Sequence, residues 1–415
     1  MSKIAEMGLA SAAVTRERWQ LAGLLAADAV STLGSEMTAI ALPWFVLVTT
    51  GSAAHTGAVL AAQFAGMALL GLGSGQLATR LGARRMMLVS DLVRAALMST
   101  IPALAYAGVF SFTVVLVVGF VVGGFFPGYS SAQRLVLADI VGDDELRLTR
   151  SGGLMSSLNE AASFAGPALG GLLVVLVGAR GVLVLDAVSY LLAFALVAGL
   201  VRAQGSAPDP TADGGIWAGL RHVAGHAVWR LRVLGVGLIE VGWSAMMATL
   251  PLLALRGGGA AVAGWLLAAY GAGSVVGGLL SSRAKRADGH TTPLAIAGMA
   301  ASTWLLPFPV PVWATALAVA ANGVCAGLFF PRFFAALTTG TPSALRARVL
   351  TAVTIAISLP GVLGFLGAGL IAQRTGSTTW SLALVSAAVT AGAAVLLSRV
   401  TAGSPRAAPE SAPLP

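Results

Sequence analysis

The sequence predicts an all-α membrane protein in which twelve transmembrane helices form two pseudo-symmetric six-helix bundles. Three observations lead to this fold class: the apolar composition, the distribution of arginine and lysine, and an internal repeat. Of 415 residues, 57% are hydrophobic and only 10% are charged, which is more apolar than a soluble domain requires. A spanning helix takes about 20 apolar residues, so the chain has room for about a dozen spans. The apolar runs are continuous and lack the alternation of barrel strands.

Polar or basic segments divide the apolar runs, and each run is a predicted span. The spans are expected at residues 20–49, 56–78, 86–107, 112–133, 153–177, 181–201, 231–255, 262–282, 292–308, 312–336, 349–373 and 378–398. A stretch rich in Pro, Gly and Asp interrupts the series and predicts a linker. The expected organisation is therefore a cytoplasmic tail at 1–19, a first bundle at 20–201, a linker at 202–230, a second bundle at 231–398 and a disordered tail at 399–415.

The basic residues predict the orientation, because short cytoplasmic loops retain positive charge. With both termini in the cytoplasm, the cytoplasmic segments hold 21 of the 25 Arg and Lys residues, and Arg94 lies inside a span. The external loops hold only Arg180, Arg256 and Arg374. The first 18 residues have no apolar core or cleavage site of a signal peptide. The net charge of +9 is spread over loops, so we expect contact with the lipid bilayer and none with nucleic acid.

The two halves of the chain resemble each other. GAVLAAQFAGMALLG from Gly57 aligns with GWLLAAYGAGSVVGG from Gly264, and FFP at 125–127 recurs at 329–331. The FFP offset of 204 residues pairs Glu36 with Glu240, whereas aligning the nearby prolines pairs Glu36 with Ser244. Duplicated halves that bind substrate between them near the midplane are typical of secondary transporters.

Acidic residues inside spans are the candidates for proton coupling. Asp28, Thr32, Ser35 and Glu36 follow helical spacing in the first span, and an ionised carboxylate in hydrocarbon costs a few kcal/mol. Loss of water favours the neutral form of such a group, which suits proton exchange. Glu36, near mid-span, is the primary candidate, with Asp28 nearer the cytoplasm and Glu240 in the second half. The alternative is a protonated or hydrogen-bonded residue that only packs helices.

Asp186 and Glu160 are expected near the ends of their spans, where water or the interface solvates them. We therefore assign neither of them to proton coupling.

The loop after the second span reads GQLATRLGARR from Gly75. It resembles the hallmark loop of the major facilitator superfamily, roughly G-x-L-a-D-R-x-G-R-R, and the superfamily fold then implies the two bundles. The matching positions that we assign to a cytoplasmic gating loop are Gly75, Arg80, Gly82, Arg84 and Arg85. Thr79 stands where the family has an acid that latches the outward-open state, and Asp91 with Arg94 are candidates to rebuild that latch. The alternative is that the basic residues only hold topology.

The fifth predicted span contains GPALGG from Gly166. Gly166, Pro167, Gly170 and Gly171 resemble the antiporter motif of the drug/proton antiporter branches, although small residues also serve plain helix packing. SDLVRA from Ser90 and RARV from Arg346 are similar to segments of the branch that includes macrolide and enterobactin exporters. The resemblance implies a central cavity lined by the first, fourth, seventh and tenth spans. Its candidate lining residues are Trp44, Thr32, Ser35, Trp243 and Ser244.

Together these features predict a secondary transporter, and not an enzyme, in the bacterial inner (cell) membrane. It is expected to act as a monomer that exports hydrophobic or amphipathic small molecules in exchange for protons by alternating access. No Gly-Lys-Ser/Thr phosphate loop is present, so ATP is not expected to drive it. His222 and His226 lack a third ligand nearby, so no metal site and no cofactor are expected. The alternatives are a dedicated exporter of an endogenous metabolite or siderophore, and a membrane sensor or scaffold without transport.

Overall fold

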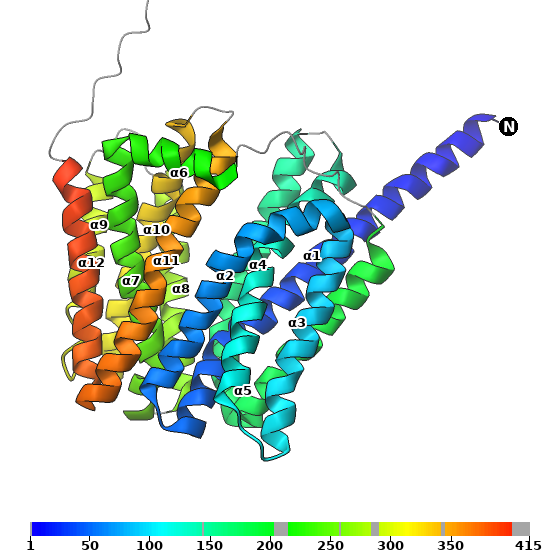
Figure 1. Cartoon of the computed structure of the whole chain (residues 1–415). Coiled ribbons are helices and arrows are strands. Elements are labelled where there is room, and N and C mark those ends of the chain that lie inside the picture. The colour runs from blue at the N-terminus through cyan, green and yellow to red at the C-terminus, as the bar shows by residue number, and fades with distance from the viewer. Residues whose placement is uncertain are drawn as a thin grey trace, which may run out of the picture.

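The computed structural model describes residues 2–142, 145–202, 215–256, 259–283, 290–341 and 345–400, and all regular structure in these ranges is helical (Figure 1). The helices are α1 Ser2–Thr50, α2 Ala53–Leu81, α3 Ala83–Tyr106, α4 Phe112–Val141, α5 Glu145–Leu200, α6 Gly215–Gly225, α7 Ala227–Arg256, α8 Ala260–Arg283, α9 Thr291–Thr303, α10 Val312–Thr339, α11 Arg346–Thr375 and α12 Thr378–Val400.

The helices match the predicted spans with three differences. Ten of the described helices are long and apolar enough to cross a membrane, and α5 contains two spans because the chain kinks at Gly178, whose φ is 76°. The helix α9 has 13 residues, about 20 Å, which is shorter than the hydrocarbon core. The helix α6, with 11 residues, lies within the predicted linker. In addition, α1 starts well before residue 20, and its first turns project beyond the other helices (Figure 1).

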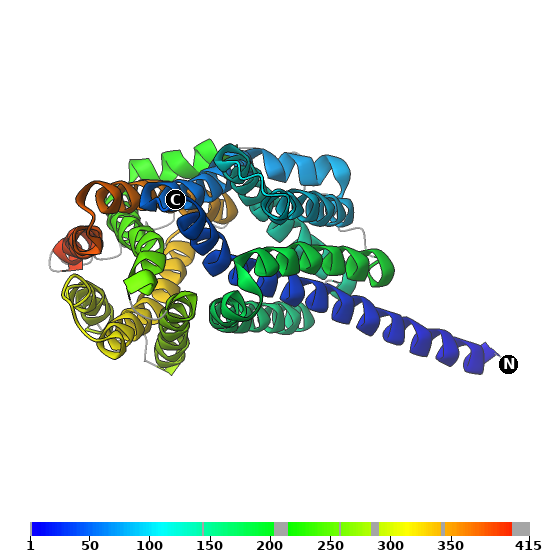
Figure 2. The ribbon, with the colours of Figure 1, turned by 90° about the horizontal axis from the view of Figure 1, so that it is seen from below.

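The helices pack as two groups with the same neighbour pattern. In the first half α1 and α3 pack on α5, α2 packs on α4, and α3 packs on α4. In the second half α7 packs on α11 and α12, α8 on α10, and α9 on α10 and α12. Figure 2 shows the two groups side by side. Because α5 counts as two spans, each contact in one half has its counterpart six spans away, which is the pseudo-symmetry that the sequence repeat predicts.

The halves meet along two seams, α2 on α11 and α5 on α8. A Cβ on Gly369 would lie 2.7 Å from the carbonyl oxygen of Ala53, and one on Gly264 would lie 2.5 Å from that of Pro167. Only glycine permits such close backbone approach. Ala53 begins α2 and Gly264 lies in the first two turns of α8, and the end at which α2 begins is opposite to the start of α1 (Figure 1).

The two halves have different cores. The first half contains two apolar clusters, and on α3 one ends at Met87 and the other begins at Ala95. Between them lie Ser90, Asp91 and Arg94, all of them buried. In the second half, one continuous cluster contains most of the buried apolar residues that are described, and it extends to Ile40, Leu60 and Ala61 of the first half. A buried polar layer therefore divides the first bundle.

Candidate functional site

A central cavity of about 540 Å³ lies between the two halves. Residues of α1, α2, α3, α4 and α5 line it from the first half, and residues of α7, α8 and α11 line it from the second. Its charged lining residues are Glu36, Arg94, Glu160 and Asp186. Apolar side chains such as Leu60, Met67, Phe126 and Met247 form much of the remaining wall. The cavity thus combines an apolar surface with a few ionisable groups, as binding sites for amphipathic molecules do.

Glu36 lies in this cavity together with Ser35 of the predicted polar stripe. The Ser163 hydroxyl of α5 donates a hydrogen bond of 2.8 Å to the Glu36 Oε1 atom. Gly166, one turn further along α5, faces Glu36 so closely that a Cβ at this glycine would overlap the Glu36 side chain. The carboxyl group is therefore held at the contact between α1 and α5, with one hydroxyl donor beside it.

The span-five motif forms the junction of three helices. A Cβ on Gly170 would lie 2.7 Å from the Met37 carbonyl oxygen of α1, and one on Gly171 would lie 2.8 Å from the Ala260 carbonyl oxygen of α8. Pro167 precedes both glycines, and its carbonyl oxygen faces Gly264 of α8 at the seam. Close packing accounts for these small residues, as the alternative interpretation stated. The same packing connects the helix of Glu36 to the seam between the halves.

Arg94 lies in the polar layer of the first half, and it is the cation of the cavity wall. Its Nη2 atom donates to Asp91 Oδ1 at 2.6 Å. Its guanidinium carbon lies 4.3 Å from the ring centre of Tyr129 and 4.4 Å from that of Tyr190. Stacking between two aromatic faces stabilises a desolvated guanidinium. The ion pair lies within the bundle, so the latch role that we expected for Asp91 and Arg94 stays a prediction.

Asp186 shows where sequence reasoning missed a cavity residue. We expected it to be solvated near a span end, and this prediction is wrong: it is 1% exposed and lines the central cavity. Thr38 donates a hydrogen bond of 2.8 Å to its Oδ2 atom. Asp186, Ser189 and Tyr190 are three and four residues apart in an apolar span, a polar stripe like that around Asp28. That pattern was visible in the sequence. Glu160, also expected near a span end, lines the cavity as an exposed side chain.

Asp28 and Thr32 lie outside the cavity lining. Asp28 is 3% exposed, and its Oδ2 atom has no hydrogen-bond partner in the described part of the chain. Thr32 lies within 3.4 Å of the Asp28 Oδ1 atom and 3.2 Å of the Asn159 Oδ1 atom. Asp28 is thus a buried carboxyl group between α1 and α5, beside the polar layer.

Glu240 lies in a different space. It lines a pocket of about 220 Å³ inside the second half, which we call the second-half pocket; its other lining residues include Trp243, Tyr270, Asn322, Thr303 and Phe330. Trp243 and Tyr270 also line the central cavity, and their ring centres are 4.0 Å apart. This aromatic pair stands between the two spaces. Among the described residues, no group of three potential metal ligands gathers at either of them.

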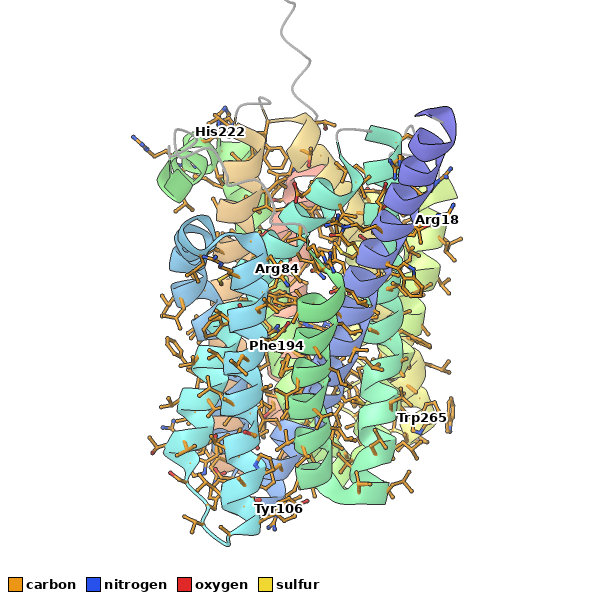
Figure 3. All side chains as sticks on the ribbon, turned by 90° about the vertical axis from the view of Figure 1, so that its right-hand side faces the viewer. Arg18, Arg84, Tyr106, Phe194, His222 and Trp265 are labelled. Carbon is orange, nitrogen blue, oxygen red and sulfur yellow. The ribbon has the colours of Figure 1, made fainter. Side chains whose placement is uncertain are left out.

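The remaining cavity candidates lie elsewhere. Ser244 is fully buried, and its hydroxyl faces Gly361 of α11. Trp44 packs against apolar clusters of both halves. By contrast, Trp265 of α8 is 67% exposed and points away from the bundle (Figure 3).

The gating loop is described in part. The surroundings of Gly75 and the side chain of Arg80 lie outside the part that the structure describes. Gly82 has a φ of 81° and forms the turn between α2 and α3, which explains a glycine at this motif position. Arg84 donates to the carbonyl oxygens of Val201 at 2.6 Å and Ala198 at 3.0 Å. Arg84 therefore caps the end of α5, and Arg85 is exposed.

Figure 3 shows Arg18, Arg84 and His222 toward one end of the molecule and Tyr106 at the other.

The family described as transmembrane secretion effector matches residues 16–412 of the chain. The chain belongs to this family. It is 27% identical over 387 residues to the multidrug efflux pump Tap of Mycobacterium tuberculosis, covering 89% of this chain and 91% of that protein. It is 27% identical over 383 residues to Tap of Mycolicibacterium fortuitum, covering 89% and 93%.

Solved structures show the same fold. The nucleoside transporter NupG superposes with a TM-score of 0.76 at 12% identity, over 91% of this chain and 99% of that one. A D-xylose–proton symporter superposes with a TM-score of 0.68 at 15% identity, over 91% and 96%. The predicted superfamily and fold class are therefore confirmed. The family and the relatives are transporters, so the prediction of a multi-pass membrane transporter and not an enzyme is also confirmed.

Proposed function

We propose that this protein is a secondary active transporter that exports hydrophobic or amphipathic small molecules in exchange for protons, by alternating access. The observation that carries the proposal is the position of Glu36 in the central cavity, where α1, α5 and α8 meet. The multidrug efflux pumps among the relatives support the direction of transport. The apolar cavity wall supports an apolar or amphipathic cargo.

Glu36 is proposed as the primary proton site. Loss of water disfavours the charged form of a carboxyl group, and the Ser163 hydrogen bond favours it. A group balanced in this way exchanges a proton when its surroundings change between the two states of the transporter. Protonation from outside would remove the charge of Glu36 and release cargo that depends on it. Asp28, buried outside the cavity, is proposed for cargo entry or gating on the cytoplasmic side.

We propose that both termini are cytoplasmic and that the membrane is the bacterial cell membrane. The basic residues Arg18 and Arg84 lie toward one end of the molecule (Figure 3), which supports that end as the cytoplasmic one. The seams near Ala53 and Gly264 would then close the external end, and cargo would enter from the cytoplasm. The gating loop would act when the cytoplasmic end closes, with Asp91 and Arg94 as candidates for its latch. The domain boundaries and the monomeric state are proposed as the sequence predicts them.

The test is proton-dependent efflux in inverted vesicles from an efflux-deficient host, with ethidium as the fluorescent cargo. Glu36→Gln keeps the shape of the side chain and removes its titration, so we expect proton-driven ethidium transport to fall to the protonophore background. Asp139→Asn is the matched control, because Asp139 is exposed on α4, outside both cavities. Full proton-dependent transport by Glu36→Gln would disprove the assignment of the proton site.

A further inference from the structure

Gln63 of α2 is a polar residue in an apolar part of the central cavity wall. The other described lining residues that α2 and α4 contribute are Leu60, Phe64, Met67, Val122, Gly123 and Phe126. The charged lining residues come from α1, α3 and α5. In the described part of the chain, the wall formed by α2 and α4 is therefore a neutral, apolar surface that carries one amide group. We call it the α2–α4 wall.

Close contact with α4 fixes the backbone around Gln63. A Cβ on Gly123 of α4 would overlap the Gln63 carbonyl oxygen, and a Cβ on Gly66 of α2 would overlap the carbonyl oxygen of Phe120. Only glycine permits such an approach at the two positions. The stem of the Gln63 side chain passes Gly119, where a Cβ would lie 3.3 Å from the Gln63 Cγ atom. Because the two helices already hold Gln63 in place, a partner would bind with little ordering cost.

The Gln63 amide makes no hydrogen bond to the described part of the chain, although the residue is partly buried. Neither amide atom is fully buried, so the amide is accessible from the cavity that Gln63 lines. Amides that join helices behave differently: the Asn322 nitrogen donates to the Met299 carbonyl oxygen at 3.1 Å, and Gln373 accepts from the Ala53 amide at 3.1 Å. An amide in an apolar wall costs free energy unless it finds a partner, which favours a ligand at Gln63 over a packing role.

The chemistry of the amide indicates what kind of group would bind. A glutamine side chain presents an acceptor oxygen and a donor nitrogen next to each other. A single ligand group satisfies both when it offers a donor beside an acceptor, as a carboxamide or a lactam does. An ammonium group would pair with the oxygen alone, and a ketone or a carboxylate would pair with the nitrogen alone. A neutral group also avoids the cost of placing a charge against an apolar wall.

We propose that Gln63 recognises a neutral carboxamide or lactam group of the cargo through two hydrogen bonds, while the apolar part of the cargo contacts the α2–α4 wall. Phe64 pairs with Phe365 of α11 at a ring-centre distance of 4.8 Å, and both rings line the cavity, so this side of the cavity also offers an aromatic surface. The inference rests on the proposed function, because the bound molecule is then the cargo. Gln63 is a specificity residue and takes no part in proton exchange.

The test uses two uncharged probes of equal shape and the full-length protein in lipid nanodiscs. The probes are 2-naphthamide and 2-acetylnaphthalene, in which a methyl group replaces the NH₂ group of the amide. Isothermal titration calorimetry, with empty nanodiscs as the reference, gives the ratio of the two dissociation constants, which we call the amide preference. Gln63→Met keeps the length of the side chain and removes its amide. The amide preference should fall about tenfold in this variant, which corresponds to about 1.4 kcal/mol.

Gln373→Met is the matched control, because it makes the same substitution at an exposed glutamine outside both cavities and should keep the amide preference. An unchanged preference in Gln63→Met overturns the proposal, and so does failure of the native protein to bind the amide probe.

A second variant keeps the test decisive if Gln63→Met binds neither probe. Gln63→Glu then decides, because its carboxyl group still accepts a hydrogen bond from the N–H of the amide probe: a preference as large as the native one supports the proposal, and a smaller or absent one overturns it. Probe binding needs no proton gradient, whereas the proton site is tested by transport of Glu36→Gln in vesicles. A failure of cargo recognition is therefore distinguishable from a failure of proton coupling.

Discussion

Arg94 is a permanent cation inside a membrane-spanning helix, and such residues are rare because hydrocarbon does not solvate them. Three groups compensate here: the Asp91 carboxylate at 2.6 Å and the faces of Tyr129 and Tyr190. The side chain of Arg94 is 5% exposed and that of Asp91 is 0% exposed. The pair is thus a buried ion pair, in which each charge depends on the other.

Asp91→Asn should destabilise the protein strongly. It leaves the Arg94 guanidinium buried without its carboxylate, and breaking such a pair costs about 3 to 5 kcal/mol. Thermal unfolding in detergent, followed by tryptophan fluorescence, should show a clear fall in the unfolding midpoint.

The double variant Asp91→Asn/Arg94→Gln is the control for this prediction. It removes both charges, and most of the lost stability should return, because no unpaired charge is left. A double variant as unstable as the sum of the two single variants would show that the pair does not act as a unit.

The sequence predicts which residues of the site are ionisable, because a charged residue inside a long apolar run is easily recognised. Glu36 lies in the central cavity and Glu240 in the second-half pocket, but their different surroundings depend on Ser163 and Asn322, which are far away along the chain. Asp186 was missed because its partner Thr38 and much of the cavity that it lines come from other helices. A sequence shows which residues are polar, whereas tertiary packing decides which partners they meet.

At the scale of helices, the α5–α8 seam depends on a glycine that permits backbone contact. Gly171 faces the Ala260 carbonyl oxygen and Gly264, where a Cβ would lie at 2.8 and 3.1 Å. Since helix association in membranes relies on close packing, a larger side chain here must separate the two helices.

Gly171→Val should reduce transport about tenfold or more, because a shift of about 1 Å at a site can cost 100-fold in rate. Spin labels on α5 and α8 should report a longer distance in this variant. Gly278→Val is the matched control, since a Cβ at Gly278 has no neighbour within 4 Å. Equal transport by the two variants would contradict a role for the seam.

Gly178 separates the two spans of α5. Its φ of 76° and ψ of 162° are accessible to glycine but strained for other residues. Gly178→Ala should therefore lower the free energy of unfolding by about 1 to 3 kcal/mol. Gly199→Ala, also in α5 and without a neighbour for the new Cβ, should have little effect. The two variants can be compared by denaturant unfolding, and equal stability would argue against a conformational requirement at Gly178.

The helices themselves were largely predictable, because long apolar runs have few alternatives in a bilayer. The contacts at the helix ends and turns were less predictable. The loop motif contains Gly82 at the α2–α3 turn, but a family pattern does not state that Arg84 caps the end of α5 through Val201 and Ala198. Likewise the shortness of α9 follows from the turns after Thr303 and not from a loss of apolar residues.

At the scale of the whole molecule, the sequence repeat predicts two similar halves, but the apolar cores of the two halves differ. The halves share their helix packing, yet the first contains a buried polar layer between two apolar clusters and the second contains one continuous cluster. Ionisable groups with fixed partners are thus concentrated in the first half, which suits proton exchange.

Alternating access requires the two halves to separate at the seam where they now touch. At the α2–α11 seam, Gln373 of α11 accepts a hydrogen bond of 3.1 Å from the Ala53 amide of α2. The chain has a single cysteine, Cys325, so Cys325→Ser provides a background for the pair Ala53→Cys and Gln373→Cys. A short bis-thiosulfonate reagent should join the two new thiols and hold the seam closed.

Efflux by the cross-linked protein should fall to background, because a closed seam prevents the second state of the cycle, and reduction of the cross-link should restore it. The controls are the two single-cysteine variants treated with the same reagent, which should transport normally. Binding of ethidium should survive cross-linking, since the central cavity already exists with this seam closed. Transport at the native rate by protein that is fully cross-linked would show that the α2–α11 seam does not open during the cycle.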